Sequence, residues 1–192
     1  EYMSLEGMDA RVRERFEQMV ERVKQSGAEI VEVSLPHTKY ALPTYYVLCP
    51  SEVSSNLARY DGMQYGHRSP DAQSLQEVLV QTRGHGFGAA AKRRILIGTF
   101  CLSAGYVDAY YKKAQRVRTL IRQDFDEAFR LVDVLLTPIS PTLPFRIGER
   151  QNDPLSMYAA DVFTVPAPLA GVPAISVPTG VKVFNWVATM WR

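Results

Sequence analysis

The feature that most constrains the fold is an apolar stripe through residues 107–131 that leads straight into a short apolar run. Its members recur every three or four positions, which is the spacing of one face of an α-helix. They are Tyr110, Ala114, Val117, Ile121, Phe125, Ala128 and Val132. Residues 133–137 (DVLLT) follow and end at Pro138, as is typical of a strand buried on both faces. A long amphipathic helix joined to a buried strand indicates an α/β fold.

The rest of the chain continues this alternation of helices and strands. Asp9 can cap a helix that Ser26-Gly27 ends, and Pro50 is expected to kink a later helix. Helices are predicted over residues 10–25, 43–58, 69–83 and 89–102, with a short one after Pro154. Strands are predicted at the β-branched run 28–35 (AEIVEVSL) and at 173–178 (PAISVP). We therefore expect a mixed β-sheet covered by helices on both faces.

Composition limits the class of protein. A chain of 192 residues that is 46% apolar and 22% charged can form one domain with a core, and a net charge of +2 does not suggest nucleic-acid binding. Cys49 and Cys101 form no disulfide framework, which fits a reducing cytosol. No apolar run reaches the roughly eighteen residues of a membrane span, and nothing around Glu1 resembles a signal peptide. We expect a cytoplasmic protein, without a membrane partner, cut out of something longer.

Motifs of several other enzyme classes are missing. His37, His67 and His85 are too scattered to suggest a metal set, so no metal ligand is expected. The run GHGFG at 84–88 lacks the spacing of a dinucleotide-binding loop, and neither GxSxG nor HExxH occurs. Basic residues gather at 92–94 and between 112 and 122. Phosphate binding there is possible, but the polar faces of helices are the simpler explanation.

Three segments carry a resemblance to a known family: residues 52–68 (EVSSNLARYDGMQYGHR), 92–129 (from KRRILIGTF to DEAF) and 153–180 (from DPLSMYAAD to SVPTG). They resemble, in the same order, the amidase-signature family, and within it the glutaminase subunits of tRNA-dependent amidotransferases. The resemblance covers residues 1–180, which we expect to be part of one amidase-signature domain. Residues 181–192 depart from the family pattern and are expected to be a truncation scar or an artefact.

The resemblance implies amide hydrolysis by two serines and a lysine, with the nucleophile in a Gly/Ser-rich segment. This chain has no two adjacent glycines and no such segment. Ser54 and Ser55 are adjacent, but they match a different block of the family and are expected to be structural. No catalytic residue is therefore assigned here. The nucleophile and the lysine lie outside this chain, which alone is expected to be inactive.

What the chain could supply is the recognition of free glutamine. Glutamine carries an α-carboxylate and an α-ammonium, so a selective site needs a cation and an anion on one wall. Arginine offers two parallel donors to a carboxylate, and aspartate can accept from an ammonium. By the resemblance, Arg94 and Asp161 stand where the family places such residues, and Tyr45 supplies a nearby hydroxyl. From the residues alone, a surface Arg, a surface Asp and a half-buried Tyr would be the plainer interpretation.

The resemblance also implies a role for the intact protein. It would hydrolyse glutamine and pass ammonia to a partner within a hetero-oligomer with subunits B and C. The complex, using ATP and Mg²⁺, would amidate Glu-tRNA(Gln), and often Asp-tRNA(Asn), with ATP and tRNA held mainly by the partner. No cofactor is expected on this chain, and the location would be the cytoplasm, or an organelle in a eukaryote. Two alternatives stay open: a stand-alone amidase of the same family, and a non-catalytic interaction module.

Overall fold

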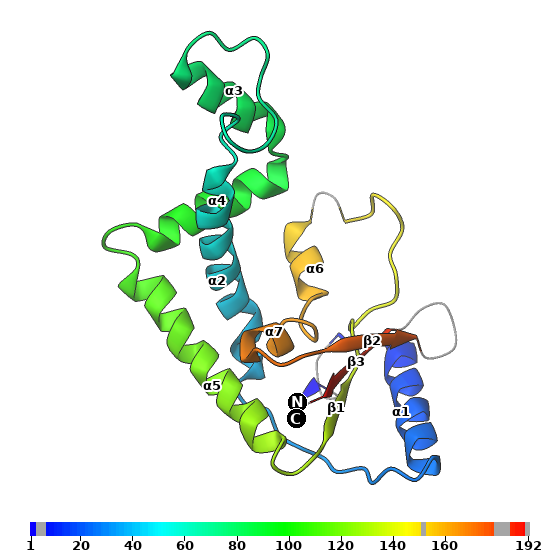
Figure 1. Cartoon of the computed structure of the whole chain (residues 1–192). Helices are drawn as coiled ribbons and strands as arrows, with labels where there is room; N and C mark the ends of the chain where they lie inside the picture. The colour runs from blue at the N-terminus through cyan, green and yellow to red at the C-terminus, as the bar shows by residue number, and fades with distance from the viewer. Residues whose placement is uncertain (3–6, 151–152, 179–184, 191–192) are drawn as a thin grey trace. The chain divides into compact units, whose positions relative to one another are not determined.

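The computed structural model describes residues 1–2, 7–150, 153–178 and 185–190. The chain forms two compact units, one made of residues 1–43 and 117–192 and the other of residues 44–116 (Figure 1). Each unit has buried apolar side chains of its own, such as Ile121 and Phe163 in the first and Leu48 and Val78 in the second. Among the described residues, no helix has the length and apolar character needed to cross a membrane.

The first unit begins with helix α1, Ala10–Gln25. Asp9 caps it as predicted, because its carboxylate accepts the backbone N–H of Arg11 at 2.9 Å, which satisfies one of the unpaired amides of the first turn. The backbone N–H of Asp9 donates to the carbonyl of Pro141 at 2.9 Å, so the proline-rich loop holds the start of the helix. Ser26 ends α1, and Gly27 follows with a φ of 98°.

A three-stranded sheet lies in the same unit (Figure 1). It consists of β1 (Val134–Thr137), β2 (Ile175–Pro178) and β3 (Asn185–Met190), in the order β1-β3-β2. Both pairings are antiparallel, with Leu136 and Ile175 each opposite Ala188. The predicted strands at 133–137 and 173–178 are confirmed to within two residues, but not their burial on both faces. Val134, Ile175 and Val177 are 40%, 56% and 42% exposed.

Three helices complete the core of this unit: α5 (Lys113–Ala128) from residue 117 onward, α6 (Pro154–Ala159) and α7 (Pro166–Ala170). Asp153 caps α6 by accepting the backbone N–H of Ser156. The guanidinium of Arg118 on α5 donates to the carbonyl of Leu169 at the end of α7, at 2.8 Å. The predicted stripe faces this core over its second half, where Ile121, Phe125 and Ala128 are buried.

The second unit is helical. It contains most of α2 (Ala41–Asn56), the 3₁₀ turn η3 (Leu57–Arg59), α3 (Leu75–Gly86), α4 (Ala89–Leu102) and the π-helical turn η4 (Asp108–Lys112). Arg83 on α3 donates to the carbonyls of Leu57 and Tyr60, at 2.9 and 3.0 Å. These bonds satisfy the acceptors that follow the end of α2 and fix the loop from residue 59 onward.

Helices α2 and α4 approach at backbone distance. A Cβ atom added to Gly98 of α4 would lie 1.9 Å from the carbonyl oxygen of Pro50 and 2.8 Å from the hydroxyl of Ser54 on α2. Gly98 is therefore required for a close approach rather than for an unusual φ. Pro50 and Ser51 at this crossing are among the most deeply buried residues of the described chain.

Several expectations need correction. Residues 28–35 are extended but form no strand, and residues 69–74 precede α3 instead of belonging to it. The sheet formed by the described residues is antiparallel, not mixed. The long helix predicted from residue 107 starts with a π-helical turn, in which a backbone N–H donates to the carbonyl five residues earlier instead of four. Helix α7 was not predicted at all.

Part of the C-terminal segment belongs to the sheet. Residues 181–184 and 191–192 lie outside the described residues, whereas residues 185–190 form β3 between β1 and β2. Trp186, Val187 and Thr189 are residue types that are enriched in strands. That residues 181–192 depart from the family sequence stays a prediction.

Candidate glutamine-recognition site

Arg94 lies on the first half of α4, a helix favoured by the three alanines at residues 89–91. Its side chain is exposed and has no hydrogen-bonding or charged partner among the described residues. The neighbouring Lys92 is occupied, because its ammonium donates to the carbonyl of Gly84 at the end of α3. Arg94 therefore keeps its paired N–H donors available for an anion such as a carboxylate.

Tyr45 belongs to the same unit as Arg94 and lies on α2. It is half-buried, and its ring contacts Tyr46 edge to face with a centroid distance of 5.3 Å. The positions of Tyr45 and Arg94 can be measured along their helices from the crossing of α2 and α4. At 1.5 Å per residue, Arg94 is about 6 Å along its helix from Gly98, and Tyr45 about 8 Å along its helix from Pro50. Both lie within two helical turns of one rigid contact.

Asp161 lies in the first unit, in the turns between α6 and α7. Its carbonyl accepts the backbone N–H groups of Thr164 and Val165 at 3.0 and 3.1 Å, and the hydroxyl of Thr164 at 3.1 Å. Phe163, two residues later, is only 2% exposed and stacks on Tyr2 at 5.1 Å. The backbone at Asp161 is therefore held in place by the core, and its side chain is half-buried.

Arg94 and Asp161 belong to different units. That both side chains bind the same glutamine stays a prediction of the family resemblance. Within the second unit, Arg94 and Tyr45 lie on the two helices that cross at Gly98 and Pro50. The sequence alone could not indicate this crossing, because the signal is a single small residue, Gly98, in an otherwise ordinary helical pattern.

Two nucleophilic side chains of the second unit, those of Ser54 and Cys101, are in environments that do not favour nucleophilic attack. Ser54 donates its hydroxyl to the carbonyl of Ser51 at 2.8 Å, within its own helix, as expected for a structural residue. Burial raises the pKa of the Cys101 thiol, and the side chain is 4% exposed. A buried thiol with a raised pKa stays protonated at neutral pH and is a poor nucleophile.

A His–Asp pair that was not singled out from the sequence lies in the first unit. Asp124 on α5 accepts the backbone N–H of His37 and contacts its ring Nδ1, each at 2.7 Å. Asp124 is 6% exposed, while the imidazole is about one-third exposed. The pair ties the segment before η2 (Thr38–Tyr40) to α5 and satisfies both oxygens of a buried carboxylate. Its partners are 87 residues apart, which is why no local pattern indicated it.

Replacing Asp124 by alanine is expected to destabilise the first unit by about 2–4 kcal/mol. The substitution removes two short hydrogen bonds to a buried carboxylate and leaves the amide of His37 unpaired. Chemical denaturation monitored by circular dichroism would measure the change. Asp126→Ala on the same helix is the control, because Asp126 is about half-exposed and its ion pair with Arg122 is 3.8 Å long. Equal losses for both variants would contradict this account of the pair.

Comparison with known proteins gives a consistent result. The family model described as "Amidase" matches residues 2–184. The A subunit of the glutamyl-tRNA(Gln) amidotransferase of Trichlorobacter lovleyi is 58% identical over 178 residues, covering 93% of this chain and 37% of that protein. The protein of the same name from Rhizorhabdus wittichii is 61% identical over 177 residues, covering 92% and 36%. The chain thus spans just over a third of these relatives.

Solved structures agree. A crystal structure of the A subunit of the glutamyl-tRNA(Gln) amidotransferase of Thermotoga maritima has a TM-score of 0.69 and 39% sequence identity, covering all of this chain and 37% of that one. A crystal structure titled as an amidase has a TM-score of 0.68 at 22% identity, which supports the fold alone. With a family match over nearly its whole length, the chain belongs to the amidase family, the amidase-signature enzymes.

Proposed function

We propose that this chain is part of the glutaminase subunit of a tRNA-dependent amidotransferase. The observation that carries the proposal is the relatedness to proteins named as the A subunit of glutamyl-tRNA(Gln) amidotransferases. Those named above are 58% and 61% identical to more than nine-tenths of this chain. The matched stretch is long enough to include α4, which carries Arg94, and the turns that carry Asp161.

The substrate of the proposed site is free glutamine. Arg94 binds the α-carboxylate through two parallel N–H donors, and Asp161 accepts from the α-ammonium. Tyr45, which lies in the same unit as Arg94, lends its hydroxyl. The availability of the Arg94 guanidinium within the described chain supports this assignment. A stand-alone amidase acting on simple amides would have no zwitterion for this pair to bind, so substrate preference distinguishes the two functions.

The complete subunit would release ammonia by hydrolysing the side-chain amide with a serine and a lysine from outside this chain. In a hetero-oligomer with subunits B and C, that ammonia would amidate Glu-tRNA(Gln), and Asp-tRNA(Asn) where it is a substrate. ATP, Mg²⁺ and tRNA would be bound mainly by the partner subunit, and the complex would work in the cytoplasm or in an organelle. In the complete subunit, further strands would turn the observed antiparallel sheet into a mixed one covered on both faces.

A graft tests the proposal. The stretch of the Trichlorobacter lovleyi protein that aligns with this chain is replaced by this chain, and ammonia release is measured with glutamine and with simple aliphatic amides. The graft is expected to prefer glutamine strongly. A folded graft that hydrolyses simple amides equally well would support the stand-alone amidase instead.

The chain by itself is expected to release ammonia from glutamine at no more than a small residual rate, far below that of an enzyme. It lacks the Gly/Ser-rich nucleophile segment, and binding groups without a nucleophile leave only a small residual rate. A coupled ammonia assay on the purified chain measures this. Turnover at an enzymatic rate that Ser54→Ala or Ser55→Ala abolishes would place the nucleophile within the chain, contrary to the proposal.

A further inference from the structure

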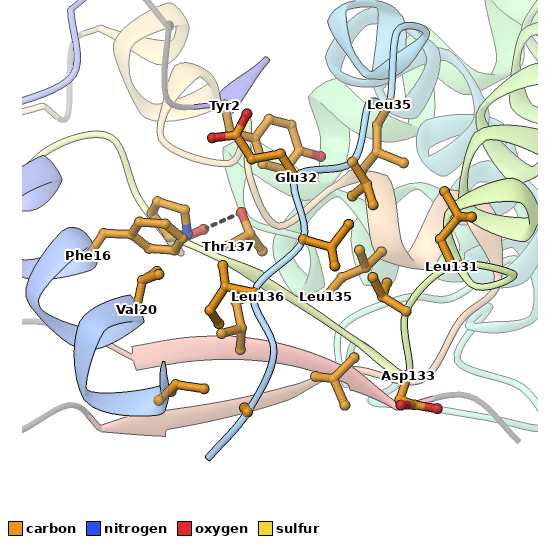
Figure 2. A pocket seen from close by; sticks show the side chains of 18 of the residues that line it. Tyr2, Phe16, Val20, Glu32, Leu35, Leu131, Asp133, Leu135, Leu136 and Thr137 are labelled. Carbon is orange, nitrogen blue, oxygen red and sulfur yellow. Dashed lines mark hydrogen bonds between the residues drawn. The ribbon is translucent and has the colours of Figure 1, made fainter. Parts of the chain in front are cut away.

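A hollow of about 880 Å³ lies in the first unit between α1, residues 28–35 and β1, and its walls are mainly apolar (Figure 2). Strand β1 is at the edge of the described sheet, so the hollow lies where the complete subunit is proposed to add further strands. The hollow is thus explained by the fold rather than by a ligand.

A different kind of site is the loop at residues 59–68 in the second unit, the 59–68 loop, which one turn of α3 holds at both ends. At its start, Arg83 donates to two main-chain carbonyls. At its end, Ser69 donates its backbone N–H to the hydroxyl of Thr82 at 3.0 Å and its own hydroxyl to Gln81 at 2.9 Å. Ser69 and Thr82 are 7% and 6% exposed, so the base of the loop is buried.

The tip of the 59–68 loop is ordered by hydrogen bonds of its own. The carboxylate of Asp61 accepts the backbone N–H groups of Met63 at 2.9 Å and Gln64 at 3.3 Å, and the N–H of Gly62 donates to the carbonyl of Tyr65 at 3.1 Å. The bonds from Met63 and Gln64 lower the pKa of Asp61, so this carboxylate is ionised at neutral pH and is occupied by the loop's own main chain. Gly62 supplies the φ of 77° that the turn requires.

This ordered loop exposes side chains of the types that form the centres of protein interfaces. Tyr60, Met63 and Tyr65 are 43%, 53% and 53% exposed. Arg68 is exposed, and its guanidinium has no hydrogen-bonding or charged partner among the described residues. Aromatic residues, Met and Arg are enriched at interfaces, whereas Lys, Glu, Ser and Ala are depleted, and the 59–68 loop contains none of the last four. Because the loop is already ordered, a partner would not have to offset the entropy of ordering it.

The charges of the 59–68 loop favour a protein partner over a nucleic acid. Within the described loop only Arg68 has an unoccupied guanidinium, because Arg59 donates to the carbonyl of Asn56 at 3.2 Å. The ionised Asp61 lies in the same loop. A nucleic-acid surface needs several cations that neutralise successive phosphates, and the loop does not provide them. One guanidinium together with two tyrosines suits a carboxylate at the rim of an apolar groove.

We propose that the 59–68 loop docks another subunit of the amidotransferase, through a groove that takes Met63 and Tyr65 and a carboxylate that pairs with Arg68. This inference rests on the proposed function, since the relatives named above are subunits of such an enzyme. It adds to that function a surface by which the subunit assembles with its partner.

The affinity of the graft for the Trichlorobacter lovleyi partner subunits, measured by isothermal titration calorimetry, tests the proposal. Arg68→Glu is expected to lower the affinity by about 30-fold or more, because a carboxylate would then face a carboxylate, and Tyr65→Ala by about tenfold. Arg116→Glu is the matched control, since Arg116 is an exposed arginine of the same unit without a partner among the described residues, and it should leave the affinity nearly unchanged. Because Arg68 and Tyr65 are exposed, their variants should leave the melting temperature of the graft alone nearly unchanged.

Three results would overturn the docking proposal. The first is an affinity of Arg68→Glu equal to that of Arg116→Glu. The second is a clearly lower melting temperature of the Arg68→Glu graft alone, which would show that the loop packs against its own chain. The third is weaker tRNA binding by the assembled complex with unchanged subunit affinity, because the occupant would then be a nucleic acid. Failure of the proposed function would show instead in the glutamine preference of the unsubstituted graft.

Discussion

Replacing Arg94 by alanine in the complete amidotransferase is expected to lower glutamine-dependent amidation by about 30-fold or more while leaving ammonia-dependent amidation nearly intact. Removing one partner of a desolvated charged pair costs about 2–5 kcal/mol, and 1.4 kcal/mol is a factor of ten. Free ammonia bypasses the glutamine pocket, so only the first donor should be affected. The measurement is kcat/KM for tRNA amidation by the graft-containing complex with glutamine and with ammonium chloride.

Further variants sharpen this prediction. Arg94→Lys should rescue poorly, because an ammonium cannot reproduce the two parallel bonds of a guanidinium. Asp161→Ala should show the same donor selectivity as Arg94→Ala. Arg93→Ala is the matched control, since Arg93 is the exposed neighbour on the same helix and no role is assigned to it. If Arg94→Ala reduced amidation equally with both donors, the residue would act in folding or docking, and the pocket assignment would have to be abandoned.

Replacing Gly98 by alanine is expected to destabilise the second unit by about 3 kcal/mol or more. The added Cβ would lie 1.9 Å from the carbonyl oxygen of Pro50 and 2.4 Å from its carbonyl carbon. Neither is the movable end of a side chain, so α2 and α4 must separate at a buried crossing. Thermal unfolding of the chain, followed by circular dichroism, measures the loss.

Gly84→Ala on α3 is the control for Gly98→Ala. A Cβ at Gly84 meets nothing within 4 Å, and alanine is the better helix former by roughly 1 kcal/mol, so this variant should be neutral or slightly stabilising. A Gly98→Ala variant as stable as Gly84→Ala would show that the helices do not cross at backbone distance.

Sequence reasoning succeeded where the signal is local. The Asp9 cap, the Ser26-Gly27 stop and the periodic stripe of α5 each depend on residues within a few positions of one another, and the structure confirms all three. The short helix after Asp153 was predicted for the same reason. Five-residue helices such as α7 give too few turns for a period to show, although Pro166 and Gly171 frame it as a helix start and stop.

Prediction failed where the outcome depends on distant partners. Residues 28–35 have strand composition, but a strand is defined by pairing, and the described chain supplies no partner. The contact of His37 with Asp124 bridges 87 positions, and the crossing at Gly98 depends on a helix some fifty residues earlier. The candidate site could not be predicted from local patterns either. Arg94, Asp161 and Tyr45 are singled out only by family resemblance.

The most direct test of the account follows the amide nitrogen itself. The graft is assembled with the Trichlorobacter lovleyi partner subunits, ATP, Mg²⁺ and Glu-tRNA(Gln), and supplied with glutamine labelled with ¹⁵N in the side-chain amide. We expect ¹⁵N to appear in the glutaminyl group on the tRNA. We also expect Arg94→Ala in the graft to nearly abolish the label while unlabelled ammonium still supports amidation. A folded graft that amidates tRNA with ammonium but never transfers label from glutamine would contradict the central claim.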